Sequence, residues 1–154
     1  MYGITSCQKI SISPYSSRDQ KSVKELILNG LKEFGFTYSA KFDSDLEDPS
    51  IYIKNGGMFY VLKDNEKIVG TVAIINRGNV GELKRMYVDK HYQGKGYWSL
   101  LFKNAIEFCK QKKYKKLEFE TNKKFKKGHV FYKNKGCRIV REDERSYYME
   151  KKLI

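Results

Sequence analysis

The most constraining segment of the chain is a β-type run over 80–88 that leads through a glycine turn into an amphipathic helix over about 96–112. The turn contains Gly94 and Gly96, and glycine lets a backbone come close to a bound group. Free N–H groups and the helix dipole favour negative charge at the first turn of a helix. The segment therefore predicts a site for an anion, such as a phosphate group, at the start of this helix.

The remaining apolar patterns predict one domain over 1–154, since no repeat or linker interrupts them. The segment 36–55 has an ambiguous pattern and could hold both a short helix and a mobile loop. The order of elements predicts an α/β (α+β) domain with a mixed sheet that begins mostly antiparallel. Strands are expected over 9–13, 58–62, 67–75, 80–88, 116–121, 138–140 and 146–152. Besides the helix over about 96–112, helices are expected from Ser17 or Asp19 to Phe34 and over 126–134. The apolar face of the first of these helices is expected in the core.

The composition is that of a folded chain without a membrane span. Apolar residues make up 40% and aromatic residues 14% of the 154 residues. No run approaches the roughly 20 apolar residues of a span, and residues 1–8 lack the features of a signal peptide, so a cytoplasmic protein is expected. Cys7, Cys109 and Cys137 are widely spaced without nearby histidines, so we expect ordinary thiols and no metal site.

The charge favours anionic ligands, because the formal net charge is +13 and residues 110–135 hold eleven lysines but only two acidic residues. A nucleic-acid-binding module is one interpretation, since aromatic residues are interleaved with these lysines. Against it, a sheet and a helix would bury Phe119 and Phe131, and arginine is scarce in this stretch.

Two common phosphate-binding motifs fit the glycine turn poorly. A Walker A loop needs Ser or Thr after Gly-Lys, whereas Gly96 follows Lys95. A dinucleotide fingerprint has partial support from Gly94, Gly96 and the later Glu118, but Ser99 stands in place of its third glycine. Five residues also separate the strand from the glycines, where that motif has a tight turn.

Residues 82–101 resemble the acyl-coenzyme A signature of the GNAT superfamily of N-acetyltransferases, with Gln93, Gly96 and Trp98 at its pattern positions. Residues 68–72 resemble the preceding strand of that family, and 130–137 resemble its Phe-Tyr-x-x-x-Gly-Phe segment. The resemblance covers nearly the whole chain and implies a GNAT-like, mostly antiparallel sheet flanked by helices. It departs from the family pattern at Trp98, usually a small residue, at Cys137, usually phenylalanine, and at Phe125, often asparagine.

The resemblance implies an acyltransferase that moves an acetyl group from acetyl-coenzyme A (acetyl-CoA) to a primary amine by direct attack in a ternary complex. Glu82 would accept the amine proton, and Tyr132 would protonate the departing thiolate. Asn122 could substitute for the asparagine that Phe125 replaces. The implied cofactor-binding residues are Met86, Tyr87, Val88, Gln93, Gly94, Lys95, Gly96, Tyr97, Trp98, Ser99 and Asn122.

The resemblance leaves the acceptor open between a small-molecule amine, an amino acid and a peptide amine. It places the acceptor site at about 31–55 with Tyr60, and it is compatible with a homodimer. Lys95, Lys127 and Lys133 are candidates to approach the phosphates of the cofactor. A GNAT-fold protein that binds acyl-CoA as a sensor, without turnover, is an alternative to an enzyme.

Overall fold

The computed structural model describes residues 9–154. Cys7 and the segment 1–8, which were considered above, lie outside the described residues. Short 3-10 turns precede α1, follow α2 and follow β4, at Ser17–Asp19, Ser44–Glu47 and Lys90–Tyr92. The longer elements are β1 (Ile10–Pro14), α1 (Gln20–Lys32), α2 (Ala40–Asp43), α3 (Ser50–Lys54), β2 (Met58–Asp64), β3 (Lys67–Asn76), β4 (Val80–Val88), α4 (Tyr97–Gln111), β5 (Lys116–Asn122), α5 (Lys126–Asn134), β6 (Arg138–Glu142) and β7 (Ser146–Lys152).

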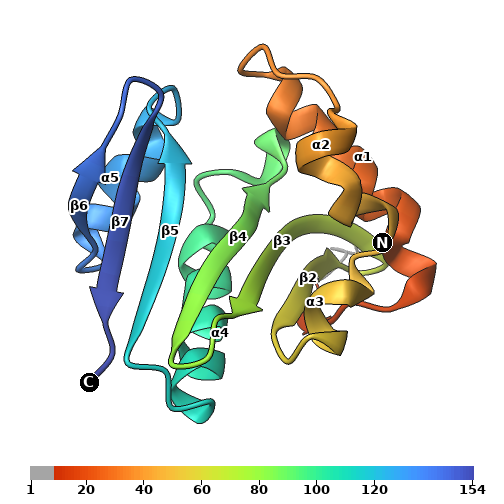
Figure 1. The fold of residues 1–154 in the computed structure, drawn as a ribbon. Helices are drawn as coiled ribbons and strands as arrows, with labels where there is room; N and C mark the ends of the chain where they lie inside the picture. The colour runs from red at the N-terminus through yellow and green to blue at the C-terminus, as the bar shows by residue number, and fades with distance from the viewer. Residues whose placement is uncertain (1–8) are drawn as a thin grey trace, which may run out of the picture.

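The strands form one seven-stranded sheet in the order β1-β2-β3-β4-β5-β7-β6 (Figure 1). Every neighbouring pair is antiparallel except β4 and β5, which are parallel. The predicted α/β class with a mostly antiparallel sheet is therefore confirmed. The central strand β3 is buried from Ile68 to Ile74 and rich in β-branched residues, which suit a strand that is covered on both faces.

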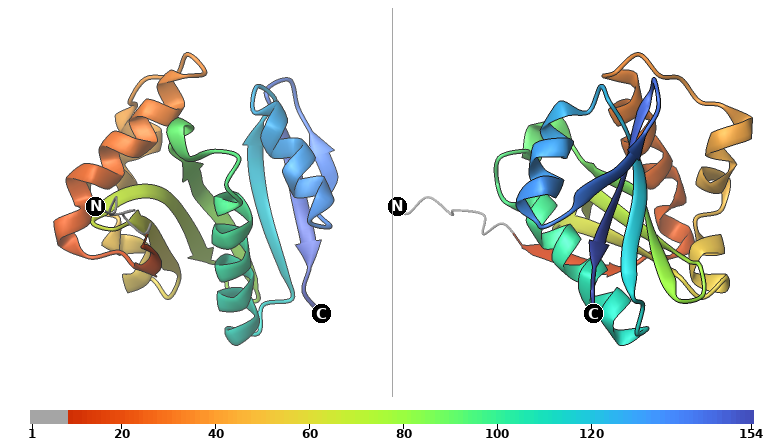
Figure 2. Two further views of the ribbon diagram at one scale, coloured as in Figure 1. Left: turned by 180° about the vertical axis from the view of Figure 1, so that it is seen from behind. Right: turned by 60° about the vertical axis from the view of Figure 1, so that its left-hand side comes forward.

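Helices cover both faces of the sheet, and each face has its own apolar core. On one face α4 packs against β3 and β4, and its buried Leu101, Phe102 and Ala105 belong to the larger core. On the other face Val23 and Ile27 of α1 pack with β2 and β3 in the second core. Viewed from behind, α4 and α5 lie in front of the sheet (Figure 2). The sheet thus separates two layers that approach β4 from opposite sides.

The parallel pair β4–β5 is short. Val80, Gly81 and Glu82 pair with Lys116, Leu117 and Glu118. Beyond this point the two strands diverge (Figure 1).

A β-bulge lies in the diverging part of β4. Thr71 of β3 pairs with Tyr87 and Ala73 pairs with Lys84, so one residue of β3 faces both Arg85 and Met86. Arg85 has a φ of 52°, in the left-handed region that residues with a side chain seldom adopt. The bulge is the physical reason for the imperfect alternation that the sequence shows over 84–86.

The segment around the end of α1 differs from the prediction. The helix ends at Lys32, and Phe34, expected on its buried face, is 36% exposed. A left-handed Gly35 (φ 82°) reverses the chain, and the ring of Phe34 instead contacts Phe125, with ring centroids 4.4 Å apart. The segment 36–55, for which the sequence pattern was ambiguous, forms α2, a 3-10 turn and α3.

Helix α1 lies close to β4 at Gly30. A Cβ atom at Gly30 would lie 2.9 Å from Cδ1 of Tyr87. Tyr87 contributes to the α1 side of the core. Glycine inside a helix costs about 1 kcal/mol relative to alanine, and here it makes room for the tyrosine ring.

We expect Gly57→Ala to destabilise the fold, because a Cβ at this position would lie 2.0 Å from the carbonyl oxygen of Ile74. Backbone atoms of a central strand cannot move away easily, so the loss should be about 3 kcal/mol of unfolding free energy. Urea denaturation followed by circular dichroism measures it. Gly128→Ala is the control, since its Cβ would find the nearest atom at 3.6 Å. Equal stability of the two variants would contradict the prediction.

Candidate active site

A cavity of about 520 Å³ occupies the space between the diverging parts of β4 and β5. Its walls come from β4 residues Leu83–Val88, from β5 residues Phe119–Asn122 and from the first turn of α5. Trp98 at the start of α4 and residues around the end of α1 also line it. The cavity therefore lies where β4 and β5 no longer pair with each other.

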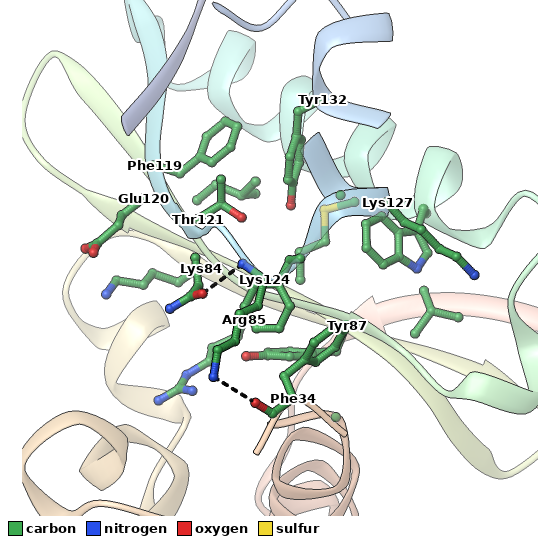
Figure 3. Close-up of a pocket in the computed structure, with 18 of the residues that line it drawn as sticks. Phe34, Lys84, Arg85, Tyr87, Phe119, Glu120, Thr121, Lys124, Lys127 and Tyr132 are labelled. Carbon is green, nitrogen blue, oxygen red and sulfur yellow. Dashed lines mark hydrogen bonds between the residues drawn. The ribbon is translucent and has the colours of Figure 1, made fainter. Parts of the chain in front are cut away.

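The two sides of the cavity differ in chemistry. Phe119 and Thr121 of β5 are buried, and the ring of Phe119 contacts Tyr132 of α5, with centroids 4.5 Å apart. Glu120, between them in the strand, is exposed and projects to the opposite face. Glu120 and Lys84 lie together at one side of the cavity, with Lys127 at the other (Figure 3). The cavity therefore has an apolar side beside α5 and a polar side with the carboxylate of Glu120.

The bulge directs a backbone N–H group of β4 into the cavity. The buried hydroxyl of Thr71 donates a hydrogen bond of 2.7 Å to the carbonyl oxygen of Arg85. In a trans peptide the C=O and N–H groups point in opposite directions. The N–H group of Met86 therefore points away from Thr71, toward the edge of β4 that faces β5. This edge has no strand partner beyond Glu82, so its polar groups remain open to a ligand.

The glycine turn leads into α4 through two residues in the left-handed region. Gly94 and Gly96 have φ values of 81° and 82°, and Gly96 caps α4 without any side-chain hydrogen bond to the first turn. The amide of Gln93 donates to the carbonyl oxygen of Val88 at 3.3 Å, which ties the turn to the end of β4. The start of α4 can therefore receive an anion.

Most of the expected cofactor-binding residues gather around this cavity. Its lining includes Met86, Tyr87, Val88, Gln93, Trp98 and Asn122. Lys127 also lines it, whereas Lys133 does not. Gly94, Lys95, Gly96, Tyr97 and Ser99 belong to the adjoining turn and first helical turn rather than to the lining.

Two of these residues have other side-chain contacts. The side chain of Tyr97 is buried in the core, so only its main chain is available to a ligand at the turn. The Nζ atom of Lys95 lies 5.2 Å from the ring centroid of Tyr92. Neither side chain is therefore placed in the cavity.

Tyr132 lies on the apolar side of the cavity, and its hydroxyl points into it (Figure 3). The residue is 7% exposed and packs against Phe102, Phe119 and Phe131. Burial is the main cause that raises the pKa of this phenol above its usual value of 10. Tyr132 is therefore protonated at neutral pH and can act as a proton donor.

Glu82 does not line the cavity. It lies at the last position where β4 pairs with β5, opposite Glu118 and before the two strands diverge. Arg77 holds its carboxylate at 3.0 Å, and Lys84 lies 3.6 Å from it. The structure therefore does not bring Glu82 together with Tyr132 in the cavity lining.

Glu120 is a cavity carboxylate that no sequence motif indicated. It lines the cavity, and one of its oxygens accepts a hydrogen bond of 2.8 Å from the hydroxyl of Ser146. In the sequence Glu120 looks like any exposed strand residue, alternating with Phe119 and Thr121. Glu120 lines the cavity only because β4 and β5 diverge, and no pattern in the sequence of β5 indicates this divergence.

Arg85 is the second residue that the sequence analysis missed. Its guanidinium bonds to both carboxylate oxygens of Asp45, at 2.6 and 2.9 Å, and to Asp43 at 3.0 Å. Tyr52 donates a further hydrogen bond of 2.6 Å to Asp45. Burial opposes the charge of Asp45, but the hydrogen bonds from Arg85 and Tyr52 hold its pKa below the usual value. The carboxylates of Asp43 and Asp45 thus balance the charge of the arginine.

Only part of the acceptor region expected at 31–55 contributes to the lining of the cavity. Phe34, Phe42 and Asp43 line the cavity, while Phe36 and Tyr60 do not. The Nζ atom of Lys124 lies 3.5 Å from the carbonyl oxygen of Phe34, which joins the turn after β5 to the end of α1 (Figure 3). This contact spans the space between the two diverging halves of the sheet.

The described residues contain no group of three His, Cys, Asp or Glu side chains arranged to hold a metal ion. Across residues 9–154, none of the helices has the length and apolar character that crossing a membrane requires.

Comparison with known proteins gives matches in sequence. Residues 25–137 match the family described as "Acetyltransferase (GNAT) family". The chain is 33% identical over 105 residues to N-acetylaspartate synthetase of Danio rerio, which covers 66% of this chain and 37% of that protein. The corresponding protein of Xenopus tropicalis is 35% identical over 102 residues, or 63% of this chain and 36% of that protein. The matches thus span little more than a third of these relatives.

Solved structures share the fold along almost the whole chain. An acetyltransferase of the GNAT family from Staphylococcus aureus Mu50 superposes with a TM-score of 0.87 and 26% identity, covering 95% of this chain and 100% of the other. PaiA N-acetyltransferase from Thermoplasma acidophilum, solved with coenzyme A, has a TM-score of 0.81 and 20% identity, covering 94% and 99%. The sequence match over most of the chain, on a shared fold, shows that this protein belongs to the acetyltransferase (GNAT) family.

Proposed function

We propose that this protein transfers the acetyl group of acetyl-CoA to a primary amine by direct attack in a ternary complex. The observation that carries the proposal is the cavity between β4 and β5, which has an open backbone edge and a tyrosine on one side and a carboxylate on the other. Such a cavity allows the thioester and the amine to approach one another from opposite faces of the sheet. Holding both reactants in this way removes much of the entropic barrier to reaction.

The cofactor is proposed to lie along the open edge of β4, with its pyrophosphate at the glycine turn. Backbone N–H groups from Met86 to Val88 would hold the pantetheine arm, and free N–H groups at the start of α4 would bind phosphate oxygens. Lys127, which lines the cavity as Trp98 does, adds positive charge. The coenzyme A in the structurally similar PaiA N-acetyltransferase supports this choice of ligand.

The chemistry needs a base, a polarised carbonyl and an acid. We assign the base to Glu120, which lines the cavity on the polar side, in preference to the ion-paired Glu82. The Met86 N–H would polarise the thioester carbonyl as negative charge develops on its oxygen. Tyr132 would then donate its proton to the sulfur of the departing coenzyme A.

The acceptor is proposed to be a small-molecule amine or a peptide amine that enters beside Glu120. Two relatives are named N-acetylaspartate synthetase, which supports an amino acid as the first acceptor to try. Lys84 lies beside Glu120 at this side and offers a positive charge to a carboxylate of the acceptor (Figure 3). Aspartate is therefore the first candidate in a screen of amines.

Trp98 provides a direct test of cofactor binding, because it is the sole tryptophan and lines the cavity. We expect a saturable change in its fluorescence on titration with acetyl-CoA at micromolar concentrations. ATP, NAD and a short DNA duplex are the controls, and each should give a weaker response. Salt-sensitive binding of DNA without a response to acetyl-CoA would favour the nucleic-acid alternative instead.

Tyr132→Phe should lower kcat about 100-fold, because it removes the proposed proton donor while keeping the ring that packs in the core. Release of the coenzyme A thiol, detected with a thiol reagent, measures the rate. The affinity for acetyl-CoA, followed through Trp98, should change less than about threefold. A variant with unchanged kcat would rule out Tyr132 as the acid.

Glu120→Gln and Glu82→Gln form a matched pair that identifies the base. We expect Glu120→Gln to lower kcat about 100-fold and Glu82→Gln to lower it less than about tenfold. The reverse order would favour Glu82, acting directly or through water, as the base that the resemblance implies. Normal binding of acetyl-CoA without turnover in the unaltered protein, on a broad screen of amines, would favour a sensor.

A further inference from the structure

We infer that Arg85 is a positioning residue, which fixes the peptide group that presents the Met86 N–H to the thioester carbonyl. The inference rests on the proposed acetyl transfer and adds a residue for which the resemblance gives no role. It concerns a side chain that lines the cavity but is bound to the protein rather than free to bind a substrate.

The main chain of Arg85 is anchored on the side of β3. Thr71 is fully buried, and its hydroxyl donates to the Arg85 carbonyl oxygen at 2.7 Å. This contact replaces the regular ladder, since the pairing of β3 with β4 shifts register at the bulge. The carbonyl oxygen of one peptide group is thus held while the opposite end of that group, the Met86 N–H, faces the cavity.

The side chain of Arg85 is anchored on the side of the segment 42–45. Besides Asp43 and Asp45, it bonds to the carbonyl oxygen of Phe42 at 3.1 Å. The side chain is 10% exposed, and the two carboxylates are 9% and 19% exposed. A planar guanidinium that forms a two-point contact with a carboxylate has one preferred orientation. The residue is therefore fixed at both ends.

This arrangement compensates for an unfavourable backbone. A φ of 52° costs of order 1 kcal/mol for a residue with a side chain and persists only where the surroundings enforce it. Neither anchor alone fixes the peptide plane, because the main chain could rotate about a single contact. With both anchors the plane is fixed before the cofactor binds.

The charge of Arg85 is also not available to an anionic acceptor. Asp43 and Asp45 together carry two negative charges against its one positive charge, and Tyr52 donates to the same Asp45 carboxylate. An arginine in a cavity of an enzyme that acts on amino acids would ordinarily be assigned to the substrate carboxylate. The contacts here assign it to the structure of the bulge instead.

The test compares Arg85→Met with the triple variant Asp43→Asn, Asp45→Asn, Arg85→Met. The single variant leaves two carboxylates without their partner and should be less stable. The triple variant removes these charges and should recover thermal stability. We expect both to lose about 100-fold in kcat, since a misplacement of about 1 Å can cost this much. The affinity for acetyl-CoA, measured through Trp98, should stay within about threefold.

Further variants separate positioning from general stability. Thr71→Val removes the hydroxyl with little change of volume and should lower kcat about tenfold at unchanged affinity for acetyl-CoA. Arg85→Lys keeps the charge without the two-point contact and should recover only part of kcat. Arg138→Gln is the control, because Arg138 pairs with Glu150 on the distant strands β6 and β7 and should leave kcat unchanged.

A triple variant that regains both stability and full kcat would overturn the inference, since Arg85 would then be needed only for folding. A loss confined to the KM of the amine, with kcat unchanged, would also overturn it and assign Arg85 to acceptor binding. These results differ from a failure of the proposed function, in which the unaltered protein transfers no acetyl group to any amine. That failure would overturn both.

Discussion

The separation of β4 from β5 after Glu82 is the constraint on which the rest of the structure depends. A sheet normally satisfies the polar groups of a central strand on both sides, yet β4 loses its neighbour halfway along its length. The unsatisfied edge lies inside the domain, where a ligand can reach it. The binding site is therefore a part of the sheet that was left incomplete, rather than a pocket added by loops.

Packing on both sides keeps this gap open. On one side the ring of Tyr132, from α5, packs against Phe119 of β5. On the other side the bulge at Arg85 is bound to the segment after α1 through Asp43 and Asp45. The contact of Phe34, just after α1, with Phe125, just before α5, connects the two diverging halves of the sheet. Each contact is made from an element that is remote in sequence, so the gap is a property of the whole fold.

The sequence predicted most elements because their signals are local. The apolar face of α4, the β-branched run of β3 and the glycine turn each depend on residues close together in the chain. The divergence of the strands was not predictable in this way, because it depends on how many steps β4 and β5 share. Tyr132 was found through a motif, whereas the places of Glu120 and Arg85 follow only from that divergence and from partners that lie 26 and 40 residues away in the sequence.

The close approach of Gly30 to Tyr87 also affects the width of the cavity. Glu33 and Phe34, which directly follow the last residue of α1, form part of the cavity wall, so the position of this helix sets the location of that wall. The helix axis can lie this near β4 because position 30 carries no side chain. A larger residue there would push the wall outward without touching a reacting group. The dimensions of the active site are thus partly determined by the side chain that is absent at position 30.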